Sequence, residues 1–150
     1  EAPDGAIDVC GTGGSGKSRI NLSTVLAINL SENFAIAKHG NKAASGRVGS
    51  FDLIETAGYA IGDSPDSVTQ QLIDKNLSFV FAPAFHPALK PLAPIRKSIN
   101  HPTIFNLLGP LLNPVPLKAQ MVGVNSIAAG DKLSEVAIRL KKHVCFVRFL

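Results

Sequence analysis

The sequence has few of the features that mark secreted or membrane-spanning proteins. Its 150 residues include only two cysteines, Cys10 and Cys145, and their wide separation excludes a disulfide-stabilised scaffold. No apolar run reaches the roughly 20 residues that cross a bilayer, and no charged segment followed by an apolar one opens the chain as in a signal peptide. We therefore expect a reduced, cytoplasmic protein without a membrane partner, in which both cysteines are buried as small apolar side chains.

A strong net charge is also missing. Fifteen basic and eleven acidic residues give a formal net charge of +4, and hydrophobic residues make up 45% of the chain. This composition excludes intrinsic disorder and predicts one domain with a substantial core. The pI of about 9.3 fits an anion-binding site or a nucleic-acid surface, but the basic residues are scattered, which disfavours nucleic acid.

The two ends of the sequence suggest a partial chain. It begins at Glu1 rather than at a methionine, and it ends in the apolar run 145–150. Because such a run is typical of a buried strand, we expect the protein to continue beyond it.

Strands and helices alternate along the sequence. Apolar runs predict strands at 6–10, 34–38, 79–82, 119–124 and 143–150. Helical spacing and capping residues predict helices at 20–32, 50–57, 64–75 and 126–142. The alternation predicts an α/β fold with a mainly parallel sheet flanked by helices.

Prolines are concentrated in one segment. Eight of the ten lie between Pro83 and Pro116, where the missing backbone donors and fixed φ angles prevent long regular elements. Short helical pieces are still expected near 89–98 and 103–108. Such a segment either shapes the wall of a site or forms an ordinary surface connection.

The strongest local motif is GTGGSGKS, from Gly11 to Ser18, between a predicted strand and a predicted helix. Glycines allow a tight turn whose N–H groups point at an anion, and the N-terminus of the following helix adds partial positive charge. We therefore expect a phosphate or diphosphate ligand at the carboxyl end of the first strand.

The same residues match the nucleotide-triphosphate loop G-x-x-x-x-G-K-[ST], with Lys17 and Ser18 in its last positions. That function also needs an acidic residue at the end of a second apolar strand to help hold Mg²⁺, and the sequence has no good candidate. A P-loop nucleotidase is therefore a weaker alternative, as is a glycine-rich turn without a ligand.

A second polar loop, 38–52, follows the next predicted strand, and its lysines, hydroxyls, amide and glycines suit a phosphorylated sugar. Adjacent parallel strands would place it beside the glycine-rich turn. Four motifs in this order resemble the anthranilate phosphoribosyltransferase family: GTGG at 11–14 with NLST at 21–24, KHGN at 38–41, FAPAFHP at 81–87 and TIFNLLGP at 103–110.

The resemblance extends over nearly the whole chain and implies a fold and an activity. The fold is the nucleoside phosphorylase/phosphoribosyltransferase type of α/β domain, of which 1–150 is a single partial domain, together with a helical domain formed partly by preceding sequence. The implied activity transfers phosphoribose from 5-phosphoribosyl-1-diphosphate (PRPP) to the amine of anthranilate, in tryptophan biosynthesis, with Mg²⁺ as cofactor. The resemblance also implies a homodimeric parent, with a glutamine amidotransferase partner or fusion in some relatives.

The resemblance further implies roles for single residues. The positions that match PRPP-binding residues are Gly11, Gly14, Ser15, Asn21, Leu22, Ser23, Thr24, Lys38, His39, Gly40, Asn41, Lys42, Ala43, Ala44, Ser45, Gly46 and Ser50. The positions that match anthranilate-binding residues are Gly11, Asn41, His86 and Arg96. Ser23 also matches a hydroxyl ligand of Mg²⁺, and no covalent nucleophile or general base is assigned.

The sequence departs from the family pattern in three places. Ser15 stands where the family usually has aspartate, and Arg19 replaces a small hydroxyl residue. The Asp-Glu pair that carries most of the family's Mg²⁺ coordination would follow the last predicted strand and is not in the sequence. Because Mg²⁺ prefers carboxylate oxygens and Ser23 alone is a poor site, we expect this chain to be inactive by itself.

The selected residues also have plainer interpretations. Lys38 could be a solvated strand end, and Ser23 could bond back to its own helical turn. His86 could merely line the proline-rich turn, and Arg96 could be a surface charge. For the chain as a whole, a nucleic-acid-binding relative without enzymatic activity and a pyrimidine nucleoside phosphorylase have the same fold and are alternatives.

Overall fold

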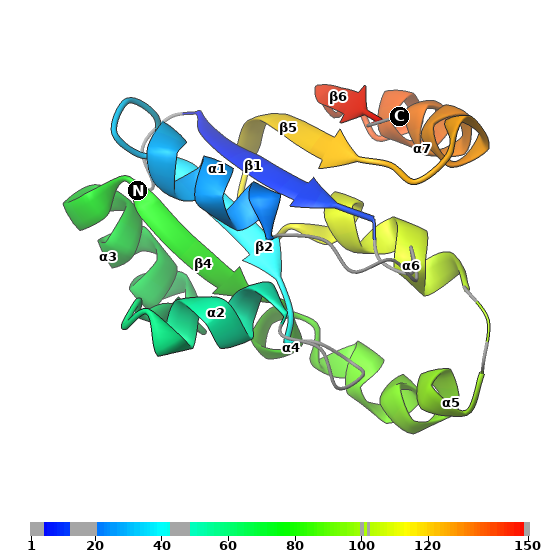
Figure 1. The fold of residues 1–150 in the computed structure, drawn as a ribbon, viewed down its shortest axis with the longest axis horizontal. Coiled ribbons are helices and arrows are strands. Elements are labelled where there is room, and N and C mark those ends of the chain that lie inside the picture. Colours follow the sequence, from blue (N-terminus) through cyan, green and yellow to red (C-terminus); the bar gives the residue numbers. More distant parts are fainter. Residues whose placement is uncertain (1–4, 13–20, 43–48, 100, 102, 149–150) are drawn as a thin grey trace.

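Six parallel strands form one sheet in the computed structural model, which describes residues 5–12, 21–42, 49–99, 101 and 103–148. In chain order the strands are β1 (Ala6–Gly11), β2 (Ile36–Gly40), β3 (Ile61–Gly62), β4 (Leu77–Phe81), β5 (Leu117–Gly123) and β6 (Val144–Val147). Their order across the sheet is β3-β4-β2-β1-β5-β6, and every neighbouring pair is parallel. The predicted α/β fold is confirmed (Figure 1).

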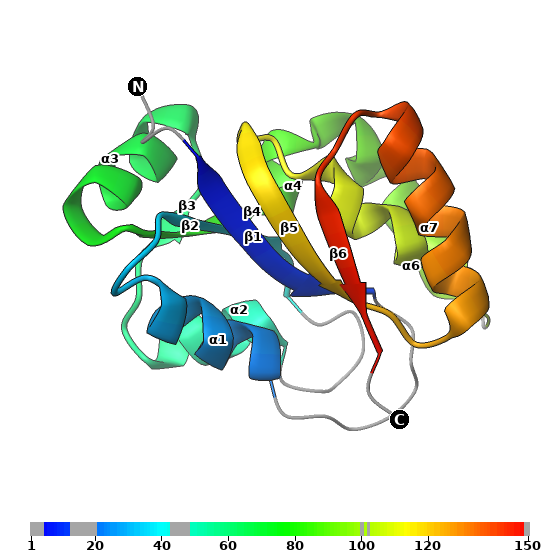
Figure 2. The same ribbon diagram turned by 90° about the horizontal axis from the view of Figure 1, so that it is seen from above.

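Helices cover both faces of this sheet (Figure 2). The α-helices are α1 (Leu22–Leu30), α2 (Ser50–Thr56), α3 (Pro65–Lys75), α4 (Ala82–Phe85), α5 (Ala93–Ser98), α6 (Ile104–Leu108) and α7 (Ile127–Arg139), and the 3-10 helices are η1 (Pro87–Leu92) and η2 (Gly109–Leu112). On one face α1 and α2 pack over β1, β2 and β4. On the other face lie α3, α4, α6 and α7.

The alternation of side chains along β1 decides what each face contains. Val9 points to the α1 and α2 face, where it joins the fully buried Phe51 in a hydrophobic cluster. Asp8 points to the opposite face, directly across from Gln120 of β5. Both of these polar side chains are almost completely buried, so this face contains a polar centre as well as apolar clusters.

Local sequence signals account for two of the helix ends that were predicted. Ser64 begins α3 as predicted, because its hydroxyl accepts a hydrogen bond from the Ser67 N–H at 3.2 Å. Helix α2 ends before Gly58, whose φ of +78° is a conformation that glycine adopts without strain. The proline-rich stretch forms only short helices, as expected, because no long element can cross it.

Several predicted strand boundaries were wrong. The second strand was expected at 34–38 but lies at Ile36–Gly40, because His39 is buried in the sheet and Gly40 continues the strand instead of starting a loop. The two-residue strand β3 was missed because so short a segment shows no periodicity. The strand expected at 79–82 begins two residues earlier, and Ala82 already belongs to α4.

Two further expectations need correction. The last helix was expected to reach residue 142 but ends at Arg139, and Lys141 adopts a positive φ of 53° that interrupts helical geometry. Both cysteines were expected to be buried, but Cys10 is only half-buried. Cys145 is exposed, because it lies on the face of the edge strand β6 that no described helix covers. Among the described residues, no helix combines the length and apolar character needed to cross a membrane.

Candidate functional site

A cleft of about 240 Å³ opens at the carboxyl ends of β1 and β5. The chain leaves β1 toward α1 on one face of the sheet and leaves β5 toward α7 on the other (Figure 2). Parallel sheets bind ligands where neighbouring strands diverge in this way. The cleft is lined by Val9, Cys10, Gly11, Thr12, Asn21, Leu22, Ser23, Leu26, Met121, Gly123, Val124, Asn125 and Val147.

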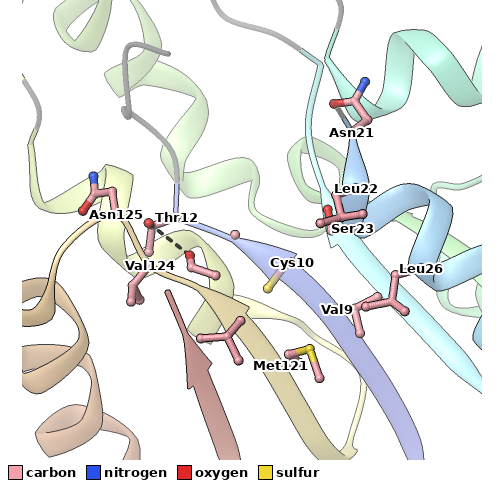
Figure 3. A pocket seen from close by; sticks show the side chains of 13 residues that line it. Val9, Cys10, Thr12, Asn21, Leu22, Ser23, Leu26, Met121, Val124 and Asn125 are labelled. Carbon is pink, nitrogen blue, oxygen red and sulfur yellow. Dashed lines mark hydrogen bonds between the residues drawn. The ribbon is translucent and has the colours of Figure 1, made fainter. Parts of the chain in front are cut away.

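Thr12 joins the two strand ends that form the floor of this cleft. Its N–H and its hydroxyl both donate to the Gly123 carbonyl, at 2.8 and 3.3 Å (Figure 3). Gly11 lies opposite Gly123 in the sheet and is exposed. The start of the glycine-rich turn is therefore held at the cleft, whereas the predicted ligands Gly14 and Ser15 lie outside the described residues.

The N-terminus of α1 forms one wall, and Leu22, Ser23 and Leu26 project toward the cleft (Figure 3). Helix N-termini carry unpaired backbone N–H groups and a partial positive charge. No acidic residue lies in the first turn of α1. The Thr24 hydroxyl is buried and has no hydrogen-bond partner within the described part of the chain. These features suit an anion better than a cation.

Lys38 places a positive charge next to Val9 and Ser23, two of the residues that line the cleft. Its side chain is only 3% exposed, and its Nζ donates to the Val9 carbonyl at 2.8 Å and to Ser23 Oγ at 3.0 Å. Burial lowers the pKa of Lys38, while the attraction of Asp8 opposes that shift. Lys38 is therefore not a solvated strand end, and Ser23 contacts β2 through this lysine.

His39 and His86 meet on the other side of the sheet. Their Nε2 atoms are 3.2 Å apart, and their rings pack edge to face. Burial, and then the neighbouring His86, lower the pKa of His39 to about 4, although a hydrogen bond with the Gly109 backbone opposes the shift. His86 thus packs against a buried residue of β2, and His39 lies beside His86 rather than beside the Lys38 ammonium.

The loop after β2 is described only in part. Asn41 and Lys42 are exposed, and Lys42 Nζ forms an ion pair with Glu55 of α2 at 2.7 Å. The predicted PRPP ligands Ala43, Ala44, Ser45 and Gly46 lie outside the described residues. Gly40 ends β2, and Ser50 begins α2. The side chain of Arg96, expected to bind anthranilate, lies outside the described part of α5.

The residues that the structure describes do not form a magnesium site by themselves. None of their His, Cys, Asp and Glu side chains gather in groups of three or more suited to a metal ion. Ser23 Oγ, the predicted ligand, already accepts a hydrogen bond from an ammonium group, and a nearby positive charge disfavours a cation. A magnesium ion here would need most of its oxygen ligands from a bound phosphate compound or from other residues.

One central residue was missed from the sequence. Asp8 is fully buried and accepts hydrogen bonds from the His39 N–H, from Asn113 Nδ2 and from Gln120 Nε2. An acidic residue inside an otherwise apolar strand was a usable signal, because buried carboxylates require hydrogen-bond partners. Its partners were not visible, since Asn113 and Gln120 are more than 100 residues away.

The chain is similar to known proteins over nearly all of its length. The sequence model of the glycosyl transferase family, a/b domain, matches residues 3–148. An anthranilate phosphoribosyltransferase from Bacillus caldotenax is 48% identical over 98% of this chain and 62% of its own length. One from Geobacillus kaustophilus is also 48% identical, over 98% of this chain and 44% of its own length. The chain thus spans about half the length of these relatives.

Solved structures give the same result. The anthranilate phosphoribosyltransferase from Thermus thermophilus superposes with a TM-score of 0.84 at 37% identity, covering 97% of this chain and 45% of that one. The Saccharomyces cerevisiae enzyme in complex with PRPP and Mg superposes with a TM-score of 0.75 at 34% identity, covering 89% of this chain and 36% of that one.

Proposed function

The chain belongs to the glycosyl transferase family with the a/b domain, and from this we propose that it supplies the PRPP-binding part of an anthranilate phosphoribosyltransferase. The complete protein would transfer phosphoribose from PRPP to the amine of anthranilate. The observation that carries the proposal is the buried Lys38 ammonium, fixed between Val9 and Ser23 at the N-terminus of α1. The named relatives support the choice of substrates.

The cleft supplies what a diphosphate leaving group requires. In the reaction, the bond between ribose C1 and the diphosphate breaks and its electron pair stays with the diphosphate. The first N–H groups of α1 and the positive charge of Lys38 stabilise that negative charge, because both are oriented before the substrate binds. The Thr24 hydroxyl is buried and does not line the cleft, so from this segment Asn21 and Ser23 are the polar side chains that face a bound phosphate.

The acceptor would approach from the side of the proline-rich segment. Anthranilate nitrogen forms the new bond to C1 and then releases a proton, so the protein must hold the amine in line with the breaking bond. His86 lies at the end of α4 next to His39, at the edge of the sheet where β2 and β4 end. We assign His86, Asn41, Gly11 and Arg96 to the anthranilate site on the strength of their motifs.

Mg²⁺ would bind together with PRPP rather than to the chain alone. The phosphate oxygens of the substrate offer the hard ligands that the described residues lack, and the yeast relative binds PRPP and Mg together. Ser23 is the residue of this chain that would face such an ion, through the oxygen that Lys38 also contacts.

Calorimetric titration of PRPP with Mg²⁺ tests the proposal. The chain should bind PRPP, and Lys38→Met should weaken binding by about tenfold or more, because a charged hydrogen-bond donor is lost. Lys75→Met is the matched control, since it removes the same charge from an exposed position at the end of α3. Circular dichroism and thermal melting would confirm that both variants are folded.

The outcomes separate the competing functions. Absence of binding at millimolar PRPP contradicts the proposal, as does equal weakening by the two lysine variants. Phosphate-dependent release of thymine by the complete gene product would instead indicate a pyrimidine nucleoside phosphorylase. ATP turnover that Lys17→Ala abolishes would indicate a P-loop nucleotidase, and salt-dependent binding of nucleic acid would indicate the non-enzymatic alternative.

A further inference from the structure

The Asp8 carboxylate occupies the polar centre of the sheet. Oδ1 accepts the His39 N–H at 3.3 Å, and Oδ2 accepts Asn113 Nδ2 at 3.0 Å and Gln120 Nε2 at 3.1 Å. A carboxylate can be buried completely only with this many donors, so Asp8 depends on its partners and they depend on it.

The two amide side chains extend this network to the segment before β5. Besides Asp8, Asn113 Nδ2 donates to the Ala37 carbonyl at 2.8 Å, and Gln120 Nε2 donates to the Pro110 carbonyl at 2.7 Å. The Asn113 Oδ1 atom in turn accepts the Val115 N–H at 3.0 Å. Through these bonds a single carboxylate connects β1, β2 and β5 to the backbone of η2.

Asp8 also forms one of the contacts that join β2 to β1. The two strands are in register at Ile7 and Ile36. Beyond that pair, side chains connect them: the His39 N–H donates to the Asp8 carboxylate, and Lys38 Nζ donates to the Val9 carbonyl. The bonds lie at consecutive residues on opposite faces of the sheet. Together with the ladder to β4, the carboxylate therefore helps to hold the backbone that presents Lys38 on one face and His39 on the other.

The pKa shifts of Asp8 and Lys38 agree with this geometry. Burial raises the pKa of Asp8, whereas the Asn113 hydrogen bond, the positive charge of Lys38, and the hydrogen bonds from Gln120 and His39 lower it. The same attraction opposes the loss of charge that burial imposes on Lys38. Each buried charge thus offsets part of the desolvation cost of the other.

We propose that Asp8 is a positioning residue for phosphoribosyl transfer, holding the Lys38–His39 end of β2 and the Pro110–Asn113 segment in one fixed arrangement. The inference rests on the proposed function, because Lys38 would stabilise the diphosphate while the segment preceding Asn113 belongs to the predicted acceptor side. Asp8 acts through these groups and is itself screened from any ligand, since it is 0% exposed.

Asp8→Asn in the complete gene product tests the inference. Asparagine keeps the shape of the side chain but places an N–H₂ group among groups that are themselves donors. We expect the Kd for PRPP and the KM values for both substrates to rise by about tenfold. Ser78→Ala is the matched control: Ser78 is also 0% exposed, and its hydroxyl donates to Gln71 Oε1 at 2.8 Å, which connects only β4 and α3.

Two results discriminate a positioning role from a merely structural one. Both variants should lower Tm, but only Asp8→Asn should change PRPP binding and the KM values. If Asp8→Asn leaves the Kd within about twofold of the unaltered protein while lowering Tm, the inference is wrong. If the unaltered protein fails to bind PRPP, the proposed function fails, and this inference with it.

A second variant covers the case in which Asp8→Asn does not fold. Asn113→Ala removes one donor to Asp8 and the bond to the Ala37 carbonyl while leaving the carboxylate in place. We expect the Kd for PRPP and both KM values to rise for this variant too, but by a smaller factor than for Asp8→Asn. Unchanged constants in folded Asn113→Ala would overturn the inference in the same way.

Discussion

The burial of a single residue, His39, makes the stability of the protein depend on pH. Its side chain is 7% exposed, and its pKa lies at about 4, below the usual value of 6.5, because burial and the nearby His86 disfavour the charged ring. The hydrogen bond with the Gly109 backbone is too weak to reverse this effect. The folded protein therefore keeps His39 neutral at pH values where the unfolded chain already binds a proton.

The predicted consequence is a loss of stability in mild acid. Between pH 6.5 and about 4 the unfolded state binds the proton and the folded state does not, so the free energy of unfolding falls as the pH falls. A shift of this size corresponds to at most about 3 kcal/mol. Urea unfolding at a series of pH values measures the effect.

His39→Asn is the control that isolates this contribution. Asparagine cannot take up a proton, so the difference in unfolding free energy between the two proteins should shrink as the pH falls toward 4. Carboxylates that titrate in the same range affect both proteins and cancel in the difference. A difference that does not vary with pH would show that the His39 ring is not held neutral by the fold.

Among single residues, Lys38 and Ser23 were selected through the KHGN and NLST motifs, which resemble those of a known family. Sequence could not show that the two side chains touch, since 15 residues separate them. Asp8 was overlooked because the strand containing it reads as an ordinary apolar run. Its importance comes from tertiary hydrogen bonds to residues 105 and 112 positions away, and no local pattern contains that information.

At the scale of elements, two glycines differ sharply in what they permit. Gly130 lies inside α7, and a Cβ there would meet Val124 at 3.5 Å, an ordinary contact. Gly62 lies in β3, and a Cβ there would come within 2.6 Å of the Val68 side chain and 2.7 Å of the Ser78 hydroxyl. Gly130 therefore lowers the stability of α7 without a packing need, whereas close packing around β3 requires glycine at position 62.

We predict opposite effects of alanine at these positions. Gly130→Ala should stabilise the protein by about 0.5–1 kcal/mol, because alanine loses less backbone entropy in a helix than glycine. Gly62→Ala should destabilise it by about 1–3 kcal/mol, because α3 and β4 must move apart. Thermal and urea unfolding measure both. Equal effects of the two substitutions would contradict the packing described for β3.

Helices were easier to predict than strands. The Ser64-Pro65-Asp66 start of α3 and the Gly58 end of α2 are local chemical signals, and both are found where expected. The strand β2 was displaced by two residues because its carboxyl half contains charged and polar side chains. Lys38 and His39 are buried because Val9, Ser23 and Asp8 supply partners from other elements. A purely local analysis therefore ends the strand at Lys38 and places His39 in a loop.

At the scale of the molecule, helices cover the sheet unevenly. Over β5 and β6, α7 packs Leu133 and Ala137 against Val122 on one face. On the opposite face, no described helix lies over these two strands (Figure 2), and Met121 is 37% exposed. The cleft lies where this open face meets α1. The alternation of strands and helices in the sequence predicted the parallel sheet. The face on which each helix packs depends on contacts between distant segments, and that choice determines where the cleft lies.

The unequal coverage predicts that the two thiols react at different rates. Cys145 is exposed on the open face of β6. Cys10 points to the covered face, where burial and then the Asp8 carboxylate raise the pKa of its thiol well above 9.0, which lowers the fraction of reactive thiolate. In the native 150-residue chain, an aromatic disulfide reagent at pH 8 should therefore release one equivalent rapidly and a second much more slowly.

Cys145→Ser should remove the rapid phase, and Cys10→Ser should leave it intact. In denaturant both thiols should react at the same rate, because unfolding removes the burial and the neighbouring carboxylate that protect Cys10. Peptide mass spectrometry after brief labelling identifies the modified residue. Rapid labelling of Cys10 in the native chain would mean that the reagent reaches this half-buried thiol from the cleft that it lines, and that the raised thiol pKa does not protect it.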